Sequence, residues 1–188
     1  MSVIVSYKNI SPKFGKDVFL APGSAVVGDV TIGSHSLVNF NAVVRGDYAK
    51  VELGEYCDIQ EGAIIHVMAD TPCKIGNNVI IGHNAIIHAQ KIGDNCVIGL
   101  GSIILGYTEI GHDVVIMPGT VIESNRKIPS NSLVQGNPAV IVRGLREDEL
   151  DALAHAAQDI RKTLGNYQIV ETTLGTVVKN GEETAKND

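Results

Sequence analysis

The segment IGDNCVIGLGSIILGYTEIGHDVVIMPGTVI, residues 92–122, decides the fold of this chain of 188 residues. Isoleucine occupies every sixth position of the segment, and glycine follows it at Gly93, Gly99 and Gly111. A helical period of about 3.6 residues cannot generate this spacing. Glycine permits the backbone conformations of tight turns, so the pattern is typical of hexapeptide repeats in which short strands alternate with turns.

The six-residue spacing of aliphatic residues continues on both sides of this segment. It is found at Val26, Ile32, Val38, Val44, Leu53, Ile59, Ile65, Ile75, Ile81, Ile87, Ile128, Val134 and Val140. Three hexapeptides make one triangular coil, so every third aliphatic position should stack into one of three internal ladders. One ladder reads Val26, Val44, Ile65, Ile87, Ile104, Ile122, Val140. Coils stacked at the ~4.8 Å spacing of neighbouring strands would close one apolar core, so residues 1–145 are predicted to form a single parallel β-helix domain.

The repeat is interrupted after Val44, Ile65 and Ile87. The extra residues in the first two interruptions predict outward loops at 46–50 and 67–73, and such insertions often mark the working face of a solenoid.

Beyond the repeats the apolar spacing changes to steps of three and four residues. This spacing predicts an amphipathic helix over residues 146–164, with Leu150, Leu153, Ala157, Ile160 and Leu164 on one side. Residues 165–188 are predicted to form a partly disordered tail, because the stretch KNGEETAKND at 179–188 has no apolar face to bury.

Composition excludes several classes of function. The formal net charge of −6 offers no basic surface for a nucleic-acid backbone. The chain has three cysteines, an odd number without CxxC spacing, and we expect them to be packing or surface thiols rather than disulfides or metal ligands. With no long apolar segment to span a membrane and no secretory leader, the protein is expected to be soluble and cytoplasmic.

Three of the six histidines fall where the repeat is interrupted. His66 follows Ile65, and His88 follows Ile87, the next member of the same ladder, so the two imidazoles should stack and face outward. A separation of ~4.8 Å lets two ring nitrogens bind one metal ion at roughly 2.0–2.1 Å each. Arg45 occupies the preceding position of the same column.

His83 lies on a different side of the predicted prism, because it follows Ile81 of another ladder by two residues. Its side chain should therefore diverge from the other two, and a threefold assembly would bring His83 of one subunit to the His66–His88 pair of the next. Three protein ligands leave a fourth position for water, as in catalytic zinc sites. The remaining histidines have no partner that the spacing predicts and are expected to lie on the surface: His35, His112 and His155.

Four stretches resemble the γ-class carbonic anhydrase family. They are RGDYAKVELGEYCDIQEGAIIH at 45–66, IGHNAIIH at 81–88, IGLGSIIL at 98–105 and VQGNPAVIVRGL at 134–145. The likeness runs from about residue 10 to about residue 150, and unrelated hexapeptide acyltransferases lack the RGD, IQ, IIH and GHNAIIH set. RGDYAK and the later NYQIV look closest to the branch associated with phenylacetate and carnitine catabolism.

The resemblance implies a left-handed coil, a homotrimer and reversible hydration of CO2 to bicarbonate. It implies zinc bound by His66 and His88 of one subunit and His83 of the next, although iron and cobalt also accept imidazole ligands. It further implies that Arg45 and Asp47 pair across the subunit interface, and that Gln60 lies beside the metal-bound water.

The sequence departs from the family at two places that bear on proton transfer. Asp58 stands where the family often has asparagine. Tyr48 stands where well-studied active members carry an acidic residue, and Asp70 is the only carboxylate of the 67–73 segment. Slow proton transfer is therefore expected.

Other functions fit the same residues. A metal-dependent hydrolase of CoA thioesters could use the same site, and members of this branch need not act mainly on CO2. A hexapeptide acyltransferase would need one histidine as a general base and no metal, and a non-catalytic assembly subunit would keep the trimer without turnover.

Overall fold

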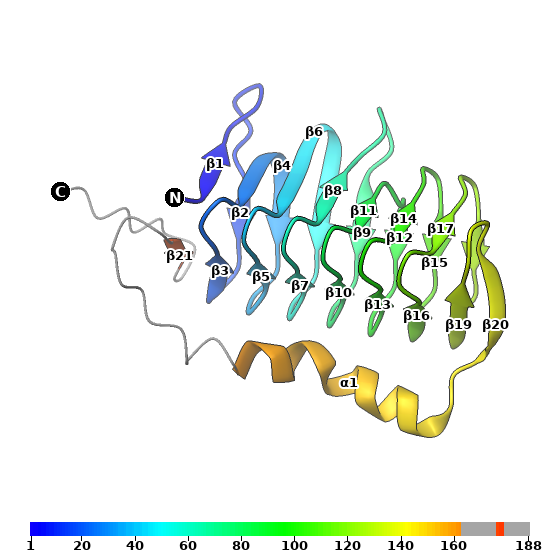
Figure 1. Ribbon diagram of the computed structural model, residues 1–188. Helices are drawn as coiled ribbons and strands as arrows, with labels where there is room; N and C mark the ends of the chain where they lie inside the picture. The colour runs from blue at the N-terminus through cyan, green and yellow to red at the C-terminus, as the bar shows by residue number, and fades with distance from the viewer. Residues whose placement is uncertain (163–175, 179–188) are drawn as a thin grey trace.

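The computed structural model describes residues 1–162 and 176–178, and it winds the chain into stacked parallel coils around an apolar core (Figure 1). The coils have three faces, each built from one short strand per coil. The first face contains β1 (Val3–Val5), β4 (Ala25–Ile32), β6 (Val43–Leu53), β8 (Ile64–His66), β11 (Ile86–Ile87), β14 (Ile103–Ile104) and β17 (Val121–Ile122).

The second face begins with β2 (Lys13–Phe14) and the later parts of β4 and β6. It continues through β9 (Cys73–Ile75), β12 (Lys91–Ile92), β15 (Glu109–Ile110) and β18 (Lys127–Ile128). The third face contains β3 (Val18–Leu20), β5 (Leu37–Val38), β7 (Asp58–Ile59), β10 (Ile80–Ile81), β13 (Val97–Ile98), β16 (Val114–Ile116) and β19 (Ser132–Gln135). Two antiparallel strands, β20 (Val140–Gly144) and β21 (Thr176–Val178), close the ends of this third sheet.

The predicted fold class, a left-handed parallel β-helix of hexapeptide repeats with a C-terminal helix, is confirmed. The ladder residues from Val26 to Ile122 are completely buried, and neighbouring strands pair in register, as Ile87 does with Ile65 and Ile104. Burial of such side chains from coil to coil is the main stabilising contribution in a stack of this kind.

The ladder does not extend to Val140, which was predicted as its last member. The chain reverses after β19, and β20 runs antiparallel to it, so Val140 pairs with Gln135. Val140 is 58% exposed, whereas Ile122 is fully buried.

Glycine and asparagine have different structural roles in the turns. A Cβ at Gly93 would lie 2.6 Å from backbone atoms of the next coil, so glycine is required there for close approach of the coils. The left-handed conformation is taken two residues later by Asn95, at φ 53°. Asparagine tolerates that region better than most residues, because its short polar side chain bonds locally.

The predicted outward loops differ from one another in the structure. Residues 46–50 lie within the extended strand β6, but Asp47–Lys50 bulge out of the pairing with β4: Gly46 pairs with Gly28 and Val51 pairs with Val30, so four residues of β6 stand opposite one residue of β4. Segment 67–73 does stand out from the coil between β8 and β9 (Figure 1), and it is closed by a bridge between Met68 and Thr71.

Helix α1 (Glu147–Lys162) runs back along the third face toward the first coils (Figure 1). Its apolar stripe buries Leu153 and Ala157, and the Leu153 carbonyl accepts a hydrogen bond of 2.7 Å from Asn78 Nδ2. No helix within residues 1–162 and 176–178 is long and apolar enough to cross a membrane. The end of the predicted helix, 163–164, and the predicted tail at 165–188, apart from β21, lie outside the described residues.

The outward side chains give each face a different character. We call the first the apolar face, because its strands stack Val3, Ala25, Val43, Ile64, Ile86, Ile103 and Val121. We call the second the charged face, because it stacks Lys13, Thr31, Glu52, Lys74, Lys91, Glu109 and Lys127. The third, which α1 follows, is the helix face.

Ile122 and Val140 provide a matched test of where the core ends. Ile122→Ala should lower the free energy of unfolding by about 2–5 kcal/mol, because it empties a filled ladder position. Val140→Ala should change it by less than about 0.5 kcal/mol. Urea denaturation of both variants measures the difference, and equal losses would place Val140 in the core.

Candidate metal centre

His66 and His88 form an edge-to-face pair at one border of the apolar face. Each directly follows the ladder residue of its strand, and parallel pairing of β8 with β11 brings the two imidazoles together. Their ring centroids are 5.1 Å apart and the planes cross at 79°. Two imidazoles on one tetrahedral metal ion at ~2.0–2.1 Å per nitrogen have centroids about 5 Å apart, so this pair fits two ligands of a zinc-like ion.

The surroundings of His88 favour the neutral imidazole that a metal requires. Burial lowers the pKa of His88, and the neighbouring His66 and Arg45 lower it further. A neutral ring keeps a nitrogen lone pair for coordination.

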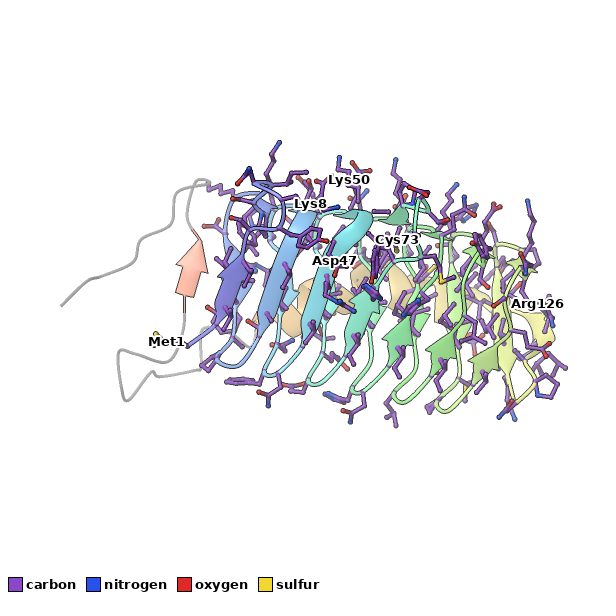
Figure 2. The ribbon with its side chains drawn as sticks, turned by 90° about the horizontal axis from the view of Figure 1, so that it is seen from above. Met1, Lys8, Asp47, Lys50, Cys73 and Arg126 are labelled. Carbon is purple, nitrogen blue, oxygen red and sulfur yellow. The ribbon has the colours of Figure 1, made fainter. Side chains whose placement is uncertain are left out.

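Asp47 connects this pair to Arg45 within the chain. Its Oδ1 lies 3.0 Å from His66 Nε2, and its Oδ2 accepts a hydrogen bond of 2.8 Å from Arg45 Nη1. Burial raises the pKa of Asp47, but His66 and Arg45 together hold it below the ordinary value. Figure 2 shows Asp47 on the body of the prism and Lys50 at its rim. The pairing of Arg45 with Asp47 across an interface stays a prediction.

Tyr48 borders the same histidines from the exposed side of β6. Its ring centroid is 5.7 Å from that of His66, and the residue is 61% exposed. Asp70, in the segment between β8 and β9, is also exposed.

His83 lies at the opposite border of the apolar face, in the turn between β10 and β11. Its Nδ1 is 2.8 Å from Oε2 of Glu61, which occupies the same turn of the preceding coil. Both side chains line a shallow hollow of 480 Å³ together with Phe40, Asn41, Gly62 and Asn84. Across residues 1–162 and 176–178, no three histidine, cysteine or acidic side chains of one chain are arranged to hold a metal ion.

The side chain of Gln60 is held by Asp58, a buried carboxylate. From the sequence, Asp58 was notable only because the family often has asparagine at that position. Gln60 Nε2 donates to Asp58 Oδ2 at 3.0 Å, and Asn39 Nδ2 donates to Asp58 Oδ1 at 2.6 Å. Burial raises the pKa of Asp58 to about 6, a rise that nearby Glu61 supports and the two amides oppose. Because both amides donate to Asp58, the Gln60 side-chain oxygen is left to accept a hydrogen bond elsewhere.

The other histidines lie away from this centre. His35 stacks on Tyr56, with ring centroids 4.9 Å apart, and His112 Nδ1 lies 2.5 Å from Asp113. His112 also lines a groove of 650 Å³ on the charged side, which contains none of the three predicted ligands. The cysteines are all buried packing residues, and burial raises the pKa of each thiol to about 12.

Comparison with known proteins decides the family. The chain is 40% identical over 156 residues to "Probable carbonic anhydrase" of Methanocaldococcus jannaschii, an alignment that covers 81% of this chain and 98% of that protein. It is 33% identical over 155 residues to "Gamma carbonic anhydrase 2, mitochondrial" of Arabidopsis thaliana, covering 79% of this chain. The chain belongs to the γ-class carbonic anhydrase family. It spans 56% of the length of the Arabidopsis protein.

One further relative and one solved structure are also similar to this chain. "Carnitine operon protein CaiE" of Escherichia coli K12 is 30% identical over 145 residues, covering 77% of this chain and 74% of that protein. A hexapeptide transferase family protein from Anaplasma phagocytophilum has the same fold, with a TM-score of 0.83 and 29% identity over 88% of this chain and 98% of that one. No protein-family model matches the chain.

The pKa of Asp58 generates a pH-dependent stability prediction. A carboxyl whose pKa rises from 3.8 to about 6 on folding favours the folded state when protonated, so its contribution is present below pH 3.8 and lost as pH rises through 6. Asp58→Asn removes this loss. The melting temperature of Asp58→Asn minus that of the natural protein should therefore increase between pH 4 and 6.5, and a constant difference would contradict the raised pKa.

Proposed function

We propose that this protein is a metal-dependent carbonic anhydrase that reversibly hydrates CO2 to bicarbonate and a proton, at sites between the subunits of a homotrimer. The observation that carries the proposal is the placement of His66 and His88 at one border of the apolar face and His83 at the other. Each border supplies part of a ligand set that one chain does not complete.

The apolar face supports an assembly of this kind. Ile64 and Ile86 are 40% and 36% exposed on its strands, and Leu100 and Leu105 are 56% and 39% exposed at its edges. The charged face has no such surface, and α1 follows the helix face. A contiguous exposed apolar surface of this kind marks a protein interface.

A threefold axis matches this surface to the histidines. Three copies that each turn the apolar face toward one axis bring the His66–His88 border of one subunit against the His83 border of the next. The assembly buries the apolar side chains and brings three imidazoles together in the same step.

A zinc ion with three imidazole ligands and one open position lowers the pKa of water to about 7, as it does in carbonic anhydrases generally, and so supplies a nucleophile at neutral pH. The side chains around the histidines have separate tasks. Gln60, whose amide nitrogen donates to Asp58, keeps its amide oxygen as a hydrogen-bond acceptor that would orient the attacking water. Arg45 and Asp47 hold His66 in place.

Hydrolysis of a CoA thioester at the same site is the second candidate. Leu105 follows His88 in the outward column and is 39% exposed, which places an apolar side chain beside the histidines where an acyl group could pack. Iron or cobalt could replace zinc in either reaction, since both bind imidazole. Metal content separates both candidates from an acyltransferase that uses a histidine alone.

The interface generates a prediction about assembly. The natural protein should be a trimer with about one metal ion per chain, because ligands come from two subunits. Ile86→Glu should give monomers without metal, since it places a charge in the apolar interface. Light scattering and elemental analysis measure both properties. Lys91→Glu on the charged face is the control and should stay trimeric and metal-loaded, whereas a metal-loaded monomer would contradict the shared site.

The reaction itself is tested by stopped-flow CO2 hydration on metal-reconstituted protein. A positioned proton carrier typically contributes ~10²–10⁴-fold and is most often a histidine or a carboxylate, whereas residue 48 is a tyrosine. Activity should be weak in dilute buffer and rise steeply with buffer concentration, and Tyr48→Glu should raise the low-buffer rate.

Gln60→Ala is the companion variant, because it acts on hydration itself and should lower the rate at every buffer concentration. High activity in dilute buffer that Tyr48→Glu leaves unchanged would assign the proton path to another group. No hydration at any buffer concentration would favour the thioester reaction.

A further inference from the structure

Glu61 is not one of the proposed metal ligands, but its side chain contacts one of them, His83. The carboxylate Oε2 lies 2.8 Å from His83 Nδ1, and the two side chains are 45% and 51% exposed. As an exposed ion pair it would contribute little to folding stability. Its effect on the ring is more specific, because a carboxylate accepts hydrogen bonds and donates none.

The carboxylate decides which nitrogen of His83 carries the hydrogen. A neutral imidazole has one N–H and one lone pair, so an Nδ1–H that donates to Glu61 leaves the lone pair on Nε2. Nε2 lies across the ring from the contact and is directed away from Glu61. His83 is therefore prepared to bind a metal ion through a single, defined atom.

The stacked turns hold Glu61 in this position. Glu61 precedes His83 by 22 residues, the same offset that separates His66 from His88. Asn84 N donates to the Glu61 carbonyl at 2.9 Å, which ties the two turns together. A Cβ on Gly62 would lie 2.3 Å from Asn84 Oδ1, so the turns approach too closely for either to shift freely.

His83 needs this support more than the other two histidines do. His66 and His88 lie against each other, and Asp47 contacts His66. Among the described side chains, Glu61 makes the polar contact with the His83 ring. His83 must reach a metal ion that is bound by another subunit. Rotation of its ring would therefore weaken metal binding more than rotation of the His66 or His88 ring.

We propose that Glu61 is a positioning residue that holds His83 in its Nδ1–H form and directs Nε2 to the metal bound by His66 and His88 of the neighbouring subunit. The inference rests on the proposed function, since it assigns the orientation of one ligand in that site. Carboxylate partners of this kind typically raise metal affinity by 10–100-fold.

The test uses Glu61→Ala and Glu61→Gln in the full chain, with two readouts. In metal-free protein at pH 8, ¹⁵N NMR of the imidazoles should show the Nδ1–H form at His83 and its loss in Glu61→Ala. Zinc competition with a chromogenic chelator should show 10–100-fold weaker binding by Glu61→Ala. Glu61→Gln should lose less, because its amide oxygen can still accept the Nδ1 hydrogen bond.

Asp113→Asn is the matched control, because it alters a carboxylate in contact with His112 at another corner of the prism. It should leave zinc affinity unchanged, and light scattering should show all variants in the oligomeric state of the natural protein. Unchanged tautomer and zinc affinity in Glu61→Ala would overturn the proposal. If the natural protein binds no zinc, the proposed function fails, and the NMR result alone then decides whether Glu61 orients His83.

Discussion

The register between successive coils is the constraint on which the rest of the structure depends. Each inward aliphatic side chain packs on its equivalents one coil before and one coil after, and slipping a strand by one residue would turn the buried set outward. The outward residues therefore also stack in fixed columns. Val44, Ile65 and Ile87 stack on one another in the core. The residues that follow them therefore stack on the outside, which brings together Arg45, His66 and His88.

This constraint explains why much of the candidate site could be predicted from the sequence. The ladder positions could be counted, and the count placed His66 beside His88 and placed His83 on another side of the prism. The same count would have found Glu61, which lies one coil before His83 at the identical offset of 22 residues. The spacing of the histidines alone does not indicate this contact, because it joins a carboxylate to an imidazole.

Other features depend on contacts that a repeat count does not describe. Val140 keeps the spacing of six, yet a chain reversal removes it from the ladder. The extra residues at 46–50 were expected to form an outward loop; Asp47–Lys50 do leave the pairing with β4, but they remain part of the extended strand β6. The environment of Asp58 also depends on tertiary contacts, since Asn39 reaches it from the preceding coil.

The path of α1 changes how the stack can come apart. Coils that contact only their neighbours can open one at a time from either end. Here α1 leaves the last coil and returns along the prism, where the Arg161 guanidinium donates to the carbonyls of Asp17 and His35 at 2.7 and 3.0 Å. The first coils are thus tied to a segment that is anchored beside the last. Fraying at one end would strain the other, so the chain is expected to unfold as one cooperative unit rather than as a series of independent repeats.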